Sequence, residues 1–197
     1  MSSQTVVAAE PSPALSRRPD RRPRQTIRKV VAAGLSELRE STYAAMSMRT
    51  VAARAGVSPA SAYRYFPSKN ALVATIYLDL LSDAPLHVDV NETTKNRVSA
   101  TMHDMALVGA DEPALTAACA TALMADDAAV APVRVQIAEE VARRIRSALG
   151  PGWPDAVIST LHMTFAGALM GSRFLPYEQV ATQLDIAIEL ILGEAHG

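Results

Sequence analysis

The sequence predicts an all-α protein of about nine helices. Hydrophobic residues make up 49% of the 197 residues but aromatic residues only 5%, and alanine supplies much of the apolar content. This balance favours helices, because strands are enriched in aromatic and β-branched residues. Apolar residues recur at helical spacing in successive segments separated by Gly, Pro and Asp, and no segment has a convincing strand pattern. A chain of this length folds as one domain or as two small ones.

Charge is divided unevenly along the chain. Residues 1–69 contain twelve Lys or Arg against four Asp or Glu, whereas residues 70–197 contain seven against sixteen. The basic excess predicts a polyanionic partner for the front part and indicates that the rear part does not contact it. Residues 1–21 contain three prolines and several arginines, so we expect a disordered basic arm that either contacts DNA or stays solvated.

Two short helices joined by a tight turn are predicted in the front part. Ser47 is a good N-cap for the first helix and Gly56 ends it, while Ser58 and Pro59 begin the second. With the helix that precedes them, they predict a helix-turn-helix DNA-binding domain over residues 22–69, in which the second short helix is the recognition helix.

The remaining helices follow from apolar periodicity and from the breakers between segments. They are expected over residues 23–39, 69–82, 92–109, 113–125, 130–149, 155–174 and 176–192. Gly34 lies on the apolar face of the first and allows another helix to approach closely. In the helix of residues 130–149, Glu139 and Arg143 as well as Glu140 and Arg144 stand at i,i+4 spacing, which predicts a solvated face.

The run VSPASAYRYFPSKNAL, residues 57–72, resembles the helix-turn-helix signature of the TetR family of bacterial regulators. Residues 48–56 are similar to that family's second helix, so the resemblance covers about a quarter of the chain. It departs from the family pattern where Ala60, Ser61 and Ala62 replace the more usual Gly-Thr-Leu. The resemblance implies a transcriptional regulator that binds double-stranded operator DNA, most often a repressor released from a near-palindromic operator by a small molecule.

The start of the recognition helix is the expected contact with bases. In a helix-turn-helix this turn enters the major groove. Ser61 can donate or accept a hydrogen bond, and Pro59 and Ala60 offer apolar contact to a thymine methyl group. The predicted DNA-binding residues, with Arg49, Tyr63 and Lys69 holding phosphates, are Met48, Arg49, Pro59, Ala60, Ser61, Tyr63, Tyr65 and Lys69. The alternative is that the tyrosines only pack and the basic groups are solvated.

The resemblance implies that residues 70–197 form a helical effector-binding and dimerisation domain. Soft and unbranched side chains adapt to varied apolar shapes, so we expect a hydrophobic effector. The candidate ligand-binding residues, many of which suit an ordinary core equally well, are Met102, His103, Met105, Cys119, Leu123, Met124, His162, Met163, Phe165, Met170 and Phe174. The last two helices carry small residues and two apolar faces, as in the family's four-helix homodimer interface. The candidate interface residues are Gly167, Gly171, Val180, Leu184, Ile188 and Ile191.

Other classes of function have little support. The chain shows no phosphate-binding glycine loop, no zinc-ligand spacing and no nucleophile motif, so neither an enzyme nor a cofactor or metal is expected. A single cysteine and the lack of a signal peptide or bilayer-spanning segment favour a cytoplasmic protein without a membrane partner. A constitutive dimeric DNA-binding protein without ligand control would have the same front part. A cavity within residues 72–175 would distinguish a ligand-responsive regulator from it.

Overall fold

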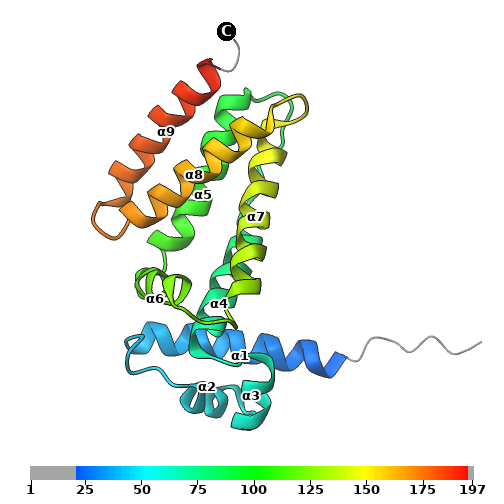
Figure 1. Ribbon diagram of the computed structural model, residues 1–197, viewed down its shortest axis with the longest axis vertical. Coiled ribbons are helices and arrows are strands. Elements are labelled where there is room, and N and C mark those ends of the chain that lie inside the picture. The colour runs from blue at the N-terminus through cyan, green and yellow to red at the C-terminus, as the bar shows by residue number, and fades with distance from the viewer. Residues whose placement is uncertain (1–20, 195–197) are drawn as a thin grey trace, which may run out of the picture.

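The computed structural model describes residues 21–194, which form nine α-helices and no strand (Figure 1). The helices are α1 (Arg21–Glu40), α2 (Met48–Ala55), α3 (Pro59–Tyr65), α4 (Lys69–Asp83), α5 (Thr94–Ala110), α6 (Pro113–Met124), α7 (Ala131–Leu149), α8 (Asp155–Gly171) and α9 (Tyr177–Glu194). The all-α prediction is confirmed. The predicted basic arm lies outside the described residues except for its last residue, at which α1 begins. Within the described part, no helix has the length and apolar character needed to cross a membrane.

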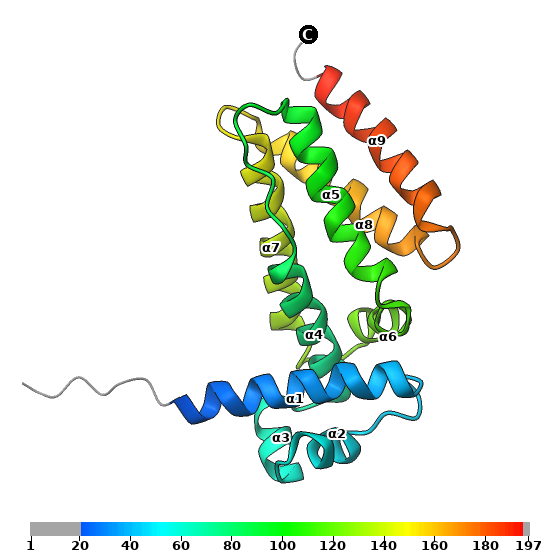
Figure 2. The same ribbon diagram turned by 180° about the vertical axis from the view of Figure 1, so that it is seen from behind.

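The helices lie in two groups. Helix α1 lies across the base of the molecule with α2 and α3 beneath it, and the other helices rise above it (Figures 1 and 2). We call α1–α3 the N-terminal unit and α4–α9 the C-terminal bundle. Helix α4 packs on α1, α6 and α7, and α5 packs on α7 and α9. Both views show α9 at the outer side of the bundle, and α8 crosses between α9 and α7.

A glycine allows the two groups to meet closely. A Cβ atom added at Gly34 of α1 would lie 2.8 Å from Cδ1 of Ile76 and 3.1 Å from Cδ2 of Leu72. Both of these α4 side chains are fully buried. The expected close approach at Gly34 is therefore confirmed, and it seats the N-terminal unit on the first helix of the bundle.

Polar contacts add to this junction. Nε of Arg39, at the end of α1, donates to both carboxylate oxygens of Glu112 at 3.0 Å, and Glu112 directly precedes α6. Asn70 of α4 accepts a hydrogen bond from Tyr43, and its amide donates to Asp127 at 3.0 Å. The N-terminal unit is thus tied to the connections at both ends of α6.

The outer face predicted for the helix of residues 130–149 is partly wrong. Arg144 is only 1% exposed, and its guanidinium donates to the carbonyl oxygens of Ser82, Ala84 and Pro85 as well as to Glu140. These carbonyls lie at the C-terminal end of α4, where a helix leaves acceptors without partners and favours a cation. The i,i+4 pair exists, but tertiary packing buries it because Arg144 caps another helix.

Candidate functional site

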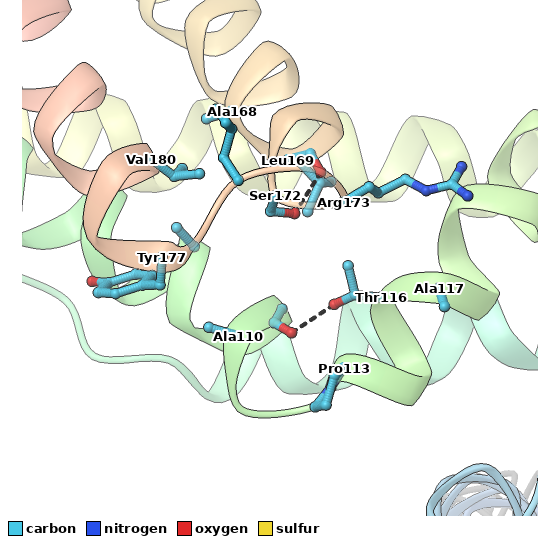
Figure 3. Close-up of a pocket in the computed structure, with 13 residues that line it drawn as sticks. Ala110, Pro113, Thr116, Ala117, Ala168, Leu169, Ser172, Arg173, Tyr177 and Val180 are labelled. Atoms are coloured by element: carbon cyan, nitrogen blue, oxygen red, sulfur yellow. Dashed lines mark hydrogen bonds between the residues drawn. The ribbon is translucent and has the colours of Figure 1, made fainter.

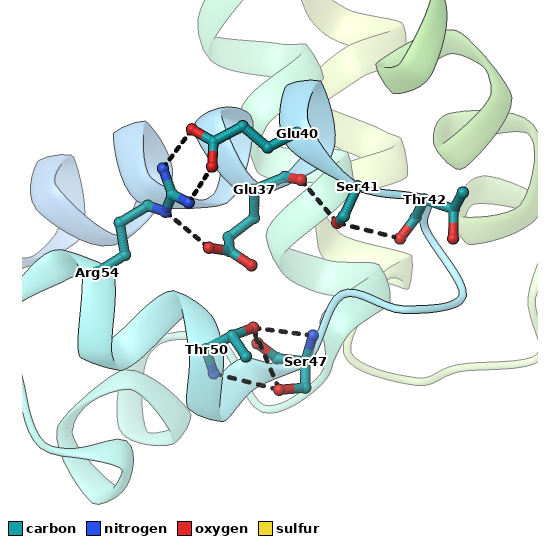
Figure 4. Close-up of polar contacts among 7 residues, drawn as sticks. All are labelled: Glu37, Glu40, Ser41, Thr42, Ser47, Thr50 and Arg54. Atoms are coloured by element: carbon teal, nitrogen blue, oxygen red, sulfur yellow. Dashed lines mark hydrogen bonds and ion pairs between the residues drawn. The ribbon is translucent and has the colours of Figure 1, made fainter.

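Helix α2 is defined by local signals at both ends. Oγ of Ser47 accepts from the backbone N–H of Thr50 at 3.1 Å, and Oγ1 of Thr50 accepts from the N–H of Ser47 at 3.2 Å (Figure 4). Gly56 has φ 66°, a left-handed conformation that glycine adopts without steric cost. The N–H of Val57 then donates to the carbonyl of Ala52 at 3.0 Å and closes the turn. The predicted caps of α2 are confirmed.

Helix α3 presents its first turn to solvent. Oγ of Ser58 accepts from the N–H of Ser61 at 3.1 Å, and Pro59 occupies the first helical position. On the inner side Ala62 and Phe66 are buried in the core, which fixes the helix against α2 and α1. Pro59 and Ala60 are exposed and Ser61 is half-buried. The turn that was predicted to contact bases is therefore accessible.

Helix α3 also carries Arg64, which is not among the predicted DNA-binding residues. The guanidinium of Arg64 lies 4.7 Å from the centre of the Tyr65 ring and also donates to its hydroxyl. Tyr63 is exposed, whereas Tyr65 is half-buried and packs against the core. Arg64 and Tyr65 thus form a stacked pair at the end of α3. The only sequence signal for Arg64 was a basic residue within the recognition helix.

The two arginines of α2 have different surroundings. Nε of Arg54 lies 2.6 Å from Glu37, and its terminal nitrogens contact both oxygens of Glu40 (Figure 4). The hydrogen bonds from Arg54 lower the pKa of Glu40, so the carboxylate stays charged. Arg49 is exposed and has no hydrogen-bond or ion-pair partner within the described part of the chain. Arg54 ties α2 to α1, while the charge of Arg49 is available to a phosphate.

Other cationic side chains of the N-terminal unit are also available to phosphates. Arg24, Arg28 and Lys29 of α1 are exposed, and none has an ion-pair partner among residues 21–194. The acidic side chains in this unit, Glu37 and Glu40, are both engaged by Arg54. The uncompensated charge of the unit is therefore positive, as binding to a polyanion requires.

Two of the predicted DNA-binding side chains are engaged within the protein. Met48 is buried in the core of the N-terminal unit, so its side chain cannot reach a base. Nζ of Lys69 donates to the carbonyl oxygens of Tyr43 at 2.8 Å and Met46 at 3.3 Å, and it lies 4.2 Å from the centre of the Tyr43 ring. Lys69 therefore holds the connection between α1 and α2, because backbone acceptors of that loop attract its ammonium group.

A cavity of about 480 Å³ opens in the C-terminal bundle, between the α5–α6 turn and the α8–α9 connection (Figure 3). Its volume lies in the range of small-molecule sites. Small and apolar side chains form most of its wall. The lining residues are Ala106, Gly109, Ala110, Pro113, Thr116, Ala117, Ala168, Leu169, Ser172, Arg173, Leu175, Tyr177 and Val180. The cavity extends beyond residues 72–175, because Tyr177 and Val180 also line it. No group of His, Cys, Asp and Glu in the described part could hold a metal ion.

None of the eleven predicted ligand-binding residues lines this cavity. Met102, Met105, Cys119 and Phe165 are buried core residues, while Met124, Met163, Met170 and Phe174 are exposed. Leu123, His103 and His162 are half-buried. Leu123 packs against the core, and Nε2 of His103 lies 3.1 Å from Oδ1 of Asp185. Partial burial lowers the pKa of His162. The prediction of the lining residues failed because flexible and aromatic side chains fill space, whereas alanine and glycine leave it empty. Alanines clustered on three helices were the useful signal.

Most of the predicted dimer-interface residues face the core of their own chain. Val180, Leu184 and Ile188 are buried within their own chain, so they cannot form an interface. Ile191 is half-buried against the core. Gly167 is exposed, and a Cβ added there would meet nothing within 4 Å. The buried side of α9 faces the bundle core, so that an interface must use the opposite side.

Comparison with known proteins identifies the family. The family described as "Bacterial regulatory proteins, tetR family" has a sequence model that matches residues 30–76, which include the second half of α1, all of α2 and α3, and the first half of α4. HTH-type transcriptional regulators of Mycobacterium tuberculosis H37Rv and Mycobacterium bovis are each 46% identical over 181 residues, covering 90% of this chain and 85% of the relative. The chain belongs to the TetR family. It is a DNA-binding transcriptional regulator and not an enzyme, as its family and its relatives indicate.

Solved structures show the same fold at lower identity. A TetR transcriptional regulator from Rhodococcus sp. RHA1 superposes with a TM-score of 0.78 at 20% identity, covering 88% of this chain and 98% of the other. A tetR-family regulator from Streptomyces coelicolor gives 0.63 at 17% identity, covering 87% and 82%. The all-helical fold of this TetR-family regulator is therefore shared along almost its whole described length.

Proposed function

We propose that this TetR-family regulator is a homodimeric repressor in the bacterial cytoplasm, and that a small, largely apolar effector releases it from a near-palindromic operator. The observation that carries the proposal is the cavity beside the α5–α6 turn, which adjoins the ion pair to the N-terminal unit. A protein whose rear part served only for dimerisation would have no use for such a cavity.

Exposed apolar side chains on α8, α9 and their connection support the dimer. Phe174 is 82% exposed, Met163 72% and Leu190 61%, and Ile186 and Met170 are also exposed. Half of the large exposed hydrophobic residues of the described chain lie between residues 163 and 190. A grouping of this kind marks an interaction surface. Packing α8 and α9 against their copies in a second chain would cover it in a symmetric four-helix arrangement.

A dimer would place two α3 helices on one face of the DNA. One short helix reads only a few base pairs, too few to select a single genomic site. A two-fold pair doubles the contacts and fits half-sites about 34–36 Å apart in successive major grooves. The operator would then be near-palindromic.

The α5–α6 turn provides a route from the cavity to α1. Gly109, Ala110 and Pro113 line the cavity, and Glu112 between them holds Arg39 of α1. Oγ1 of Thr116 donates to the carbonyl of Gly109 at 2.6 Å, so the start of α6 moves together with the turn. An effector that displaces the turn would therefore pull on α1 or break its ion pair, and would change the spacing of the two recognition helices.

The test uses the purified full-length protein and DNA from the region upstream of its own gene. We expect sedimentation to show a dimer, nuclease footprinting to show protection of a near-palindromic site, and fluorescence anisotropy to show one dimer bound to that site. Deleting the gene should raise transcription from that promoter. A fall in transcription would contradict repression. A change in transcription without direct binding would show that this DNA does not contain the operator.

The dimer face is tested separately by Leu190→Glu, which should give monomers and lose operator affinity with unchanged helix content. Val135→Glu is the matched control, since Val135 is 56% exposed on α7, outside the proposed face. A dimeric Leu190→Glu variant would refute this assignment.

A further inference from the structure

The cavity also indicates the chemical class of its ligand. We infer that the effector is a small organic acid with an apolar body, and that Arg173 binds its carboxylate at one end of the cavity. This inference rests on the proposed function, because it assumes that the cavity is the effector site.

The walls of the cavity offer few hydrogen bonds to a neutral polar ligand. Two of its three hydroxyl side chains already donate to the backbone, since Oγ of Ser172 donates to the carbonyl of Leu169 at 2.7 Å and Oγ1 of Thr116 donates to that of Gly109. The remaining wall is mainly alanine, glycine, leucine, proline and valine. Burial of apolar surface would therefore supply most of the affinity.

Arg173 is the one cation among the lining residues. Its guanidinium forms no hydrogen bond or ion pair within the described part of the chain, and its aromatic contact is the ring of the adjacent Phe174 at 5.9 Å. By contrast, Arg39, Arg54, Arg97, Arg134 and Arg144 are all bonded to carboxylates or carbonyl oxygens. An unpaired guanidinium beside an apolar cavity matches a carboxylate, which it can bind through two parallel hydrogen bonds.

Carboxylates lie near the other end of the cavity, where Tyr177 lines the wall. Figure 3 shows Tyr177 and Arg173 on opposite sides of the opening. Burial raises the pKa of Tyr177, and the nearby carboxylates of Asp104, Asp185 and Asp111 raise it further. An anionic head group would be repelled there and attracted at Arg173. The charge distribution thus orients the ligand, with its carboxylate at Arg173 and its apolar body toward Tyr177.

The experiment compares ligands that differ only in the head group. Isothermal titration calorimetry of the full-length wild-type protein would use straight-chain carboxylates from hexanoate to dodecanoate, the alcohols of equal length, and the trimethylammonium analogues. We expect the carboxylate of best length to bind about tenfold more tightly than its alcohol, as one charge-assisted contact at a partly exposed site allows. The cationic analogue should bind more weakly than either.

Three variants locate the effect. Arg173→Gln should remove the tenfold preference while keeping the affinity for the alcohol. Arg146→Gln removes an exposed arginine that does not line the cavity, and it should change nothing. Ala168→Phe fills the cavity and should abolish binding of every head group, with helix content and melting temperature retained to show that the variant is folded.

The outcomes separate this inference from the proposed function. Equal binding of acid and alcohol, unchanged by Arg173→Gln, would overturn the organic-acid assignment while leaving a neutral effector site in place. Binding that survives Ala168→Phe, or no binding by any member of the series, would overturn the ligand class altogether. Carboxylate binding that depends on Arg173 but does not weaken operator binding would support the ligand class and refute the release of the repressor.

Discussion

Replacing Arg49 by glutamine tests the assignment of phosphate contacts most directly. Arg49 is exposed near the start of α2 and has no ion-pair partner within residues 21–194. Each cation that neutralises a phosphate contributes about 0.9 to the slope of log affinity against log salt concentration. A dimer carries two copies, so Arg49→Gln should reduce the slope by about 1.8.

This change is large enough to measure. Between 50 and 200 mM salt the wild-type protein would lose about 12-fold more affinity than the variant, from a fourfold salt change raised to the power 1.8. Fluorescence anisotropy with operator and with scrambled DNA at four salt concentrations gives both slopes. The loss should be the same for both DNAs, since phosphates carry no sequence information.

The control is Arg146→Gln, which removes the same charge from an exposed position on α7. Its slope should match the wild type. If Arg49→Gln left the slope unchanged, or altered operator binding but not binding to scrambled DNA, Arg49 would not be a phosphate contact and the reasoning would fail.

Three further predictions follow from individual side chains. Ser61→Ala and Tyr65→Phe should alter which operators are preferred, by about 1–3 kcal/mol at the contacted base pair, and equal losses across a randomised operator library would place both residues on the backbone instead. Arg144→Met should lower the free energy of unfolding by about 3 kcal/mol, because buried carbonyls and Glu140 lose their partner, whereas exposed Arg143→Met should cost about 0.5 kcal/mol in the same urea titration; similar losses would contradict the capping role. Burial raises the pKa of Cys119 to about 12 from an ordinary value of 9.0, so iodoacetamide should not modify the folded protein at pH 8. Because the unfolded thiol ionises first, stability should decline as pH rises from 9 toward 12, and a Cys119→Ala variant should lack this contribution to the pH dependence.

Local interactions explain what the sequence alone determined. Ser47, Gly56 and Ser58 act within one turn of their own positions, so both ends of α2 and the start of α3 could be predicted. Together with these caps, helical spacing of apolar residues and the breakers between segments predicted all nine helices of the described chain to within a few residues. The basic excess of the front part and the motif of residues 57–72 were enough to identify a DNA-binding regulator.

Tertiary structure decided which faces are covered and which groups meet. The sequence gives no sign that Arg144 and Lys69 are anything but solvated cations, yet both donate to carbonyl groups more than twenty residues away. Helix α9 has two apolar sides, and only its packing on α5 and α8 shows that Val180 and Leu184 face inward while Leu190 remains exposed. The cavity depends on alanines from three helices that are distant in sequence, because empty space arises where small side chains meet and has no periodicity within one helix.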